Sequence, residues 1–181
     1  MASFLLVFAL CLVVQSTVAE DCKTGKSLIE DIDVYKVQDS WKVVYVNNKD
    51  LMAKFSCWVS EASTAPNGEL QLQVSIVDNS NGQNNTFHGT YEKVNGHYVD
   101  YILSDNAGLS SLYEILAVDY HRFQIITACP RAINRQPVVA ITFLTWTPSE
   151  EALKAAKEAL AKIGLDFEDF ETFCPLSEIK E

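Results

Sequence analysis

Residues 70–76 read LQLQVSI, and this stretch is the clearest strand signal in the chain. Leucine, valine or isoleucine occupies every even-numbered position, and glutamine or serine occupies every odd one. A period of two residues places the apolar side chains on one face, as in a half-buried β-strand. Seven other short runs have strand-like composition: Trp41–Asn48, Phe55–Glu61, Thr86–Val94, His97–Leu103, Leu112–Asp119, Arg122–Ala128 and Val138–Trp146. The sequence therefore predicts eight strands.

The connections between these runs are short and polar. Asn67-Gly68, Asn81-Gly82 and Asn95-Gly96 each fall between two runs. An Asn-Gly pair supplies the two positive φ angles of a type I′ hairpin turn. Consecutive hairpins place each strand antiparallel to the one before it, and eight such strands can close without leaving an unpaired edge. The predicted fold is all-β, an eight-stranded antiparallel up-and-down β-barrel.

One helix is predicted after the last strand, over Pro148–Ile163. Thr147 is placed to act as its N-cap, Pro148 fits the first helical position and Glu150 completes a capping box. Gly164 ends the helix. The apolar residues recur at the spacing of a surface helix: Leu153, Ala156, Leu160 and Ile163. We therefore expect this C-terminal helix to pack against the outside of the barrel.

The first residues have the pattern of a secretory signal peptide. Phe4–Val14 is an unbroken apolar stretch, shorter than the roughly 20 residues that a membrane-spanning helix needs, and small residues precede Glu20. We expect residues 1–19 to be a signal peptide and residues 20–181 to form a single domain. No second long apolar run follows, so the sequence predicts a secreted, extracellular protein without a membrane anchor.

Charge and motif content exclude several classes of function. The formal net charge is −10 and no Lys/Arg cluster occurs, which argues against nucleic acids and anionic membranes as partners. His88, His97 and His121 lie far apart, and no recognisable nucleophile motif is present. We therefore expect no metal, no cofactor and no enzymatic activity. Asn84 begins an Asn-Asn-Thr sequon, a candidate N-glycosylation site in a secreted chain.

Four cysteines remain once the signal peptide is removed: Cys22, Cys57, Cys129 and Cys174. An even number of cysteines in an oxidising compartment predicts two disulfide bonds. Four cysteines allow three pairings, and their spacing does not choose among them.

A longer motif gives the chain a family resemblance. Residues 113–130 read YEILAVDYHRFQIITACP, in which Asp119, Tyr120 and Phe123 match the second signature of the lipocalins. Trp41 matches the tryptophan of the first signature, which plugs the closed end of the barrel in that family. The chain resembles most closely the arthropod branch, which includes the cockroach allergen and the milk-type lipocalins, and the match covers essentially the whole mature chain.

The resemblance implies a disulfide pairing and a class of function. In related insect carriers the pairs correspond to Cys22 with Cys129 and Cys57 with Cys174. The family also implies a small hydrophobic or amphipathic ligand, bound non-covalently inside the barrel, such as a pheromone, hormone, fatty acid or biogenic amine.

Strand alternation, counted from an inward Trp41 and an outward Cys57, predicts an apolar and aromatic lining for the barrel. The residues expected to contact a ligand are Tyr45, Trp58, Phe87, Tyr91, Tyr101 and Phe143. The alternative is that these rings only fill the core, because an eight-stranded barrel is just wide enough for side chains or one small ligand.

Glu114 is the most informative single candidate. It shares a predicted strand face with Leu112, Leu116 and Val118, where an unpaired carboxylate would be costly. Directed inward, Glu114 would pair with a cationic ligand such as an amine. The alternative places its carboxylate at the rim or on a solvated outer face.

Two functions follow from this interpretation of the sequence. The leading hypothesis is a secreted carrier of a small ligand, acting as a monomer or weak homodimer. The alternative is an abundant nutritive or surface secretion in which bound lipid is incidental.

Overall fold

A computed structural model describes residues 27–29, 32–37, 39–66, 70–94, 97–103, 108–109 and 111–175. The side chains of Val34, Leu70, Leu112 and residues 91–94 and 97–103 are outside this description. The predicted signal peptide, residues 1–19, also lies outside the described residues. Among the described residues, no helix is long and apolar enough to span a lipid bilayer.

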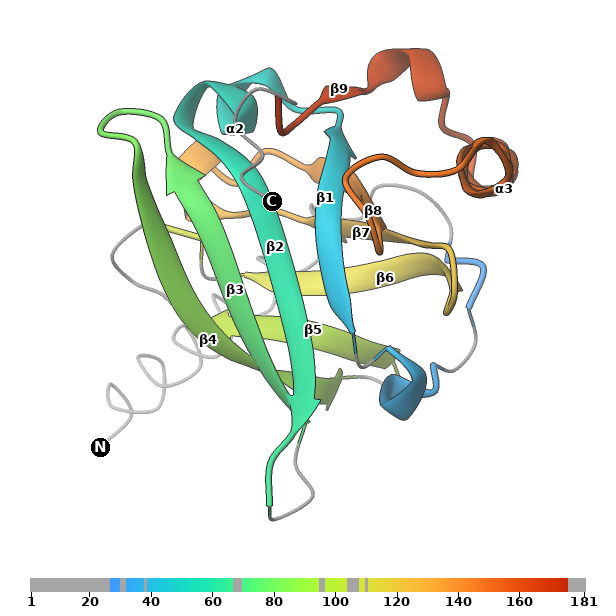
Figure 1. The fold of residues 1–181 in the computed structure, drawn as a ribbon, viewed down its shortest axis with the longest axis horizontal. Helices are drawn as coiled ribbons and strands as arrows, with labels where there is room; N and C mark the ends of the chain where they lie inside the picture. The colour runs from blue at the N-terminus through green and yellow to red at the C-terminus, as the bar shows by residue number, and fades with distance from the viewer. Residues whose placement is uncertain are drawn as a thin grey trace, which may run out of the picture.

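Eight antiparallel strands follow one another along the chain and each pairs with the next (Figure 1). They are β1 (Ser40–Val46), β2 (Phe55–Thr64), β3 (Leu70–Asp78), β4 (Gln83–Val94), β5 (His97–Leu103), β6 (Leu112–Asp119), β7 (Phe123–Ala128) and β8 (Val138–Phe143). β1 also pairs with β8 and with β2, so the eight strands form a ring. This confirms the predicted barrel and supplies the closure that the sequence could only suggest.

The junction between β1 and β2 is short and is completed by the C-terminal segment. β2 pairs with β1 only across Ser40–Lys42 and then diverges. The short strand β9 (Glu171–Thr172) occupies the edge of β1 that β2 has left, opposite Tyr45 and Val46. We call this junction the seam. It makes the ninth strand a structural member of the barrel wall, which the sequence did not predict.

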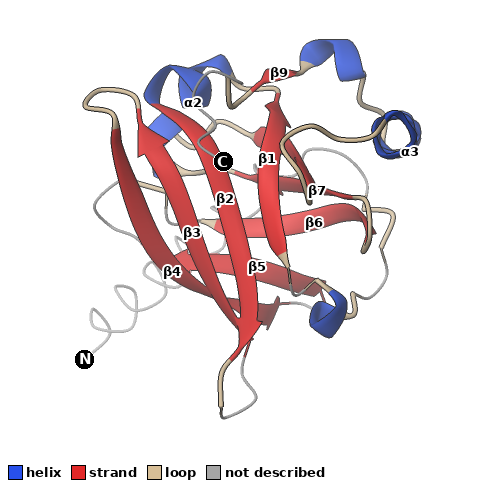
Figure 2. Cartoon of the chain, viewed as in Figure 1, coloured by secondary structure: helices blue, strands red, loops and turns tan. Residues whose placement is uncertain are grey.

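The main helix, α3 (Glu150–Lys162), lies outside the barrel as predicted (Figure 2). Its N-cap is Ser149, whose hydroxyl accepts a hydrogen bond from the Ala152 amide at 3.2 Å, so the expected cap at Thr147 is wrong by two residues. Gly164 ends the helix with a φ of +84°, in the left-handed region that glycine adopts without a steric penalty.

Shorter helices close the two ends of the barrel. α2 (Lys49–Lys54) lies in the β1–β2 connection, and the 3-10 turn η2 (Arg131–Ile133) precedes β8. At the opposite end is η1 (Val34–Lys36), where the Trp41 indole nitrogen donates to the Val37 carbonyl at 3.0 Å. A fourth turn, η3 (Phe167–Asp169), connects α3 to β9. Trp41 is 2% exposed, so this end is plugged as the family resemblance implies.

Two apolar clusters lie on opposite sides of the sheet. The interior cluster fills the barrel and includes Trp58, Leu72 and Ile126. The outer cluster lies between the barrel wall and α3 and includes Ile141 and Leu160. Strands β1, β6, β7 and β8 contribute to both clusters, so apolar residues are buried on both of their faces.

The Asn81-Gly82 connection differs from the predicted turn. Asp78 pairs with Gln83, so four residues join β3 to β4 where a two-residue type I′ turn was expected. Only Gly82 of this loop has a positive φ, +69°. The Asp78 carboxylate accepts hydrogen bonds from the Ser80 amide and hydroxyl, which stabilises the longer loop and lowers the pKa of Asp78.

The predicted pair Cys57–Cys174 forms a disulfide bond with a sequence separation of 117 residues. Cys57 has a φ of +52° at a β-bulge in β2, between Ser56 and Val59, which is where β2 leaves β1. Cys129 is also disulfide-bonded, while its predicted partner Cys22 lies outside the described residues.

Candidate ligand-binding cavity

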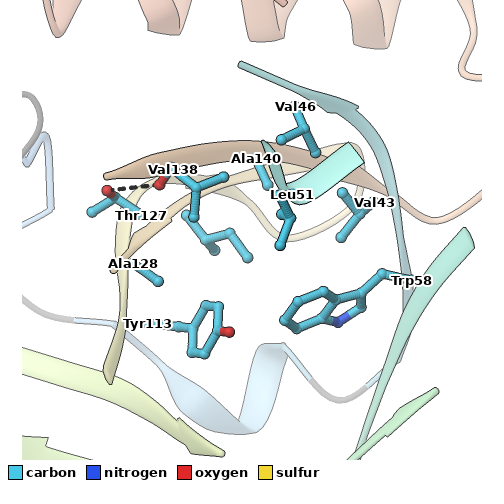
Figure 3. Close-up of a pocket in the computed structure, with 10 residues that line it drawn as sticks. Val43, Val46, Leu51, Trp58, Tyr113, Thr127, Ala128, Val138 and Ala140 are labelled. Atoms are coloured by element: carbon cyan, nitrogen blue, oxygen red, sulfur yellow. Dashed lines mark hydrogen bonds between the residues drawn. The ribbon is translucent and has the colours of Figure 1, made fainter. Parts of the chain in front are cut away.

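A small apolar cavity lies inside the barrel beneath α2 (Figure 3). It is lined by Val43, Val46, Leu51, Trp58, Tyr113, Ile126, Thr127, Ala128, Val138 and Ala140. Its free volume is about 10 Å³, near the minimum that holds one water molecule. In this conformation the surrounding side chains occupy most of the space, so an organic ligand must displace some of them.

Trp58 and Tyr113 form the aromatic part of the lining. Their rings meet edge to face, with centroids 5.4 Å apart. The Trp58 indole donates to the Ser60 hydroxyl at 2.8 Å, and the Tyr113 hydroxyl donates to the Leu109 carbonyl at 3.0 Å. Because both polar ends are satisfied, these two residues offer the cavity mainly ring surface, which suits an apolar or aromatic guest.

The structure places Trp58 in the cavity lining, in the orientation that strand alternation predicted. Phe87 is partly buried and packs against the interior cluster but does not line this cavity. The side chains of Tyr91 and Tyr101 lie outside the described residues. Asn84 is exposed, and it lies within β4 where a loop was expected.

Tyr45 and Phe143 lie on the other side of the wall, which corrects the expectation that they face the cavity. In the outer cluster, the centroid of the Tyr45 ring lies 6.3 Å from that of the Phe143 ring and 5.0 Å from that of the Phe167 ring. A register shift between Val43 and Tyr45 breaks the alternation of β1. The inward positions of β1 predicted by alternation from Trp41 are therefore wrong after Val43.

Strand alternation places Glu114 on the outer face, so the structure does not bring it into this cavity, and its pairing with a ligand amine stays a hypothesis. Its neighbours Tyr113 and Ile115 both belong to the interior cluster, so alternation puts the Glu114 side chain on the opposite face. Glu114 is half-buried there. Leu116, which the sequence grouped with Glu114, belongs to the outer cluster.

Tyr113 is the aromatic lining residue that the sequence missed. β6 has bulky apolar residues on both faces, because its outer side packs in the same cluster as α3. Periodicity alone then cannot distinguish the face of Tyr113 from the face of Glu114. The polar character of Glu114 was the one available signal, and it favours the outer face.

α2 forms a lid over the cavity, with Leu51 directed into the lining (Figure 3). Asn48 caps this helix by accepting a hydrogen bond from the Leu51 amide at 2.9 Å. Three side-chain hydrogen bonds hold the lid to its neighbours: Lys54 Nζ to the Ala132 carbonyl, Asn79 Nδ2 to the Met52 carbonyl at 2.9 Å, and Asn48 Nδ2 to the Pro137 carbonyl at 3.2 Å. These bonds keep α2 seated over the cavity in this conformation.

The main charged group near α3 is structural and lies away from the cavity. Arg122 donates two hydrogen bonds to Asp119, at 2.6 and 2.8 Å, and one to Glu151 on α3 at 3.1 Å. The hydrogen bonds from Arg122 lower the pKa of the Asp119 carboxyl and raise that of the guanidinium. This network connects the β6–β7 turn to the first turn of the helix.

No family model matches the sequence. The arrangement is similar to that of several solved arthropod proteins, and together they define its class: the chain has the lipocalin fold. Per a 4, a major allergen from cockroaches, has a TM-score of 0.70 and 20% identity, covering 84% of this chain and 94% of that chain. The structures that share this fold include proteins of the arthropod branch to which the sequence resemblance pointed.

Two further structures have the same fold. Insecticyanin from the tobacco hornworm Manduca sexta has a TM-score of 0.68 and 16% identity, covering 87% of each chain. The amine-binding protein of Rhodnius prolixus, solved as its tryptamine complex, has a TM-score of 0.63 and 14% identity, covering 87% of this chain and 88% of that chain.

Proposed function

We propose that this protein is a carrier that binds one small hydrophobic or amphipathic molecule non-covalently inside the barrel. The observation that carries the proposal is the apolar cavity inside the barrel, lined by Trp58 and Tyr113 and covered by the α2 lid. A closed eight-stranded barrel is wide enough for one small ligand, and aromatic faces bind such ligands without charge. The tryptamine complex of the Rhodnius prolixus protein is a precedent for an organic guest in this fold.

The size of the cavity makes the lid part of the function. Its volume of about 10 Å³ is far below the several hundred Å³ of an ordinary ligand pocket. Leu51 is the lining residue on the lid, so outward movement of α2 would enlarge the cavity directly. We propose that the ligand enters by displacing α2, while the plugged end at Trp41 stays closed.

The proposal includes secretion into an oxidising compartment. The Cys57–Cys174 bond and the bonded state of Cys129 are typical of extracellular proteins. We propose that residues 1–19 are removed as a signal peptide and that Asn84, exposed on β4, accepts a glycan. N-terminal sequencing of the secreted chain, and its gel mobility before and after glycosidase treatment, would test these two points.

The direct test is a titration with N-phenyl-1-naphthylamine, an apolar dye whose fluorescence rises in dry sites. Trp58→Ala should weaken dye binding about tenfold, because the indole supplies much of the aromatic lining. Trp146→Ala is the matched control, since Trp146 packs against the outer cluster, and its affinity should match that of the unaltered protein. Equal losses in both variants, or no saturable binding to the unaltered protein, would contradict the proposal.

Native mass spectrometry of protein from its natural source distinguishes the carrier from the alternative. A carrier should retain one defined small molecule at near unit stoichiometry. A heterogeneous lipid mixture would favour a nutritive or surface secretion.

A further inference from the structure

Two buried polar side chains among the described residues inside the barrel each carry an atom without a hydrogen-bond partner. Gln124 on β7 is 4% exposed and Thr142 on β8 is 2% exposed. Within the described part of the chain, Gln124 Nε2 and Thr142 Oγ1 have no partner. Leaving a buried donor or acceptor unpaired costs about 1–3 kcal/mol, so a pair of them calls for an explanation.

These two residues lie side by side and face the interior. Gln124 and Thr142 are directly paired in the β7–β8 register. The next pair, Ile125 and Ile141, belongs to the outer cluster, and the pair after that, Ile126 and Ala140, lines the cavity. Alternation therefore directs the polar pair to the same side as Ile126 and Ala140, about 7 Å further along the strands.

The polar pair lies on the side of the cavity away from the lid. Val43 lines the cavity and is the β1 residue paired with Thr142, while Val118 of β6 is paired with Gln124 and packs against the interior cluster. The Gln124–Thr142 pair is thus a polar patch between apolar walls. It lies outside the present cavity lining, so a ligand reaches it only when the cavity extends about 7 Å along the strands. We call it the polar floor.

Nearby polar groups are already engaged elsewhere. The Trp41 indole donates to the Val37 carbonyl, and the Trp58 indole donates to the Ser60 hydroxyl. Among the described residues no charged side chain is buried. Within the described side chains, a cationic or anionic ligand would therefore meet no buried counter-charge at this depth, and burial of an unpaired charge is very costly.

We propose that the polar floor binds a neutral oxygen atom at the buried end of the ligand, such as the oxygen of a ketone, ester, amide or alcohol. Gln124 Nε2 donates to that oxygen, and the Thr142 hydroxyl donates to it or accepts from it. The apolar part of the ligand then lies against Trp58 and Tyr113 under the lid. This inference rests on the proposed carrier function and narrows its ligand class to neutral, oxygen-bearing, mainly apolar molecules.

The test compares the polar-floor variants Gln124→Met and Thr142→Val, which keep side-chain volume, with Gln73→Met and Thr64→Val at exposed strand positions as controls. Dye displacement is measured with 2-nonanone, 1-nonanol, nonylamine and nonane. The unaltered protein should prefer 2-nonanone and 1-nonanol over nonane and over nonylamine. Each floor variant should lose about five- to tenfold of the ketone-over-alkane preference, and the controls should keep it.

A thermal melt of the ligand-free variants supplies a second readout. If the polar floor is unpaired in the ligand-free protein, replacing either polar side chain with an apolar one should leave the melting temperature unchanged or raise it. If the variants melt lower and keep the ketone preference, the floor holds only a structural water and the inference is overturned. Dye binding with no ketone preference in any protein also overturns it and leaves the carrier function intact, whereas absence of dye binding removes the carrier function itself.

Discussion

The two faces of the β7–β8 pair differ in how completely they are packed. On the outer face, Ile125 and Ile141 pack against Ala156 and Leu160 of α3, and all four are fully buried. On the inner face the same two strands border a cavity and carry both of the buried polar atoms that lack partners in the described part of the chain. The contrast indicates that the outer face supports the stability of the fold, while the inner face leaves contacts unmade that a ligand can complete.

The largest effect should come from breaking the outer face. Leu160→Ala removes a side chain that is 0% exposed, and we expect the free energy of unfolding to fall by about 2–5 kcal/mol, as measured by chemical denaturation. Dye affinity should stay within twofold at temperatures where the variant is folded. Leu153→Ala, at a half-buried position of the same helix, is the control and should cost less. A parallel loss of dye affinity would show that the two faces are not separable.

A smaller effect is expected from loosening the lid over the inner face. Lys54→Ala removes the hydrogen bond to the Ala132 carbonyl and leaves the cavity lining intact. We expect dye association and dissociation to accelerate by about three- to tenfold in stopped-flow measurements, with stability changed by less than about 1 kcal/mol. Lys162→Ala, on the exposed side of α3, should leave both rates unchanged. Unchanged rates for Lys54→Ala would mean that the ligand takes another route.

The sequence anticipated the elements better than their orientation. The strand runs and the helix were predictable because alternation, turn residues and caps are local signals, as residues 70–76 and Gly164 illustrate. Which residues of β1 and β8 face inward was not predictable, because both faces of these strands are apolar and the outer one is buried by α3. The register shift after Val43 reversed the side of Tyr45, and its cause is tertiary, so no local pattern marks it.

The candidate site was therefore predicted only in part. Trp58 was found because Cys57, next to it, had to face outward. The inward positions of Tyr113, Gln124 and Thr142 were missed. They depend on the pairing of β7 with β8 and on the contact between β6 and β2, which the sequence does not show. The α2 lid has too few residues to give a helical period, although Asn48 is a strong cap residue.

The smallest effect concerns the charged network that connects the β6–β7 turn to α3. Arg122 lowers the pKa of Asp119 in the folded protein, so the stabilisation is fully present above the unfolded pKa of about 3.9 and is lost as pH falls through the folded value. Because the Arg122 side chain is 40% exposed and solvent screens its charge, we expect only a small contribution to the stability of the fold. Denaturation at pH 7 and pH 3 should show that Asp119→Asn loses this extra acid sensitivity. Asp169→Asn, an exposed control, should behave as the unaltered protein does, and identical pH dependence in all three would contradict the role of the network.

The seam has a consequence for biosynthesis. The edge of β1 near Tyr45 is paired by Glu171–Thr172, and the adjoining Cys174 is bonded to Cys57, 117 residues earlier. When all eight barrel strands have been synthesised, the β9 segment that completes the wall has therefore not yet been translated. The β1 edge of a nascent chain therefore stays unpaired until translation has passed Cys174. Formation of the Cys57–Cys174 bond then distinguishes the chains in which β9 has paired with β1.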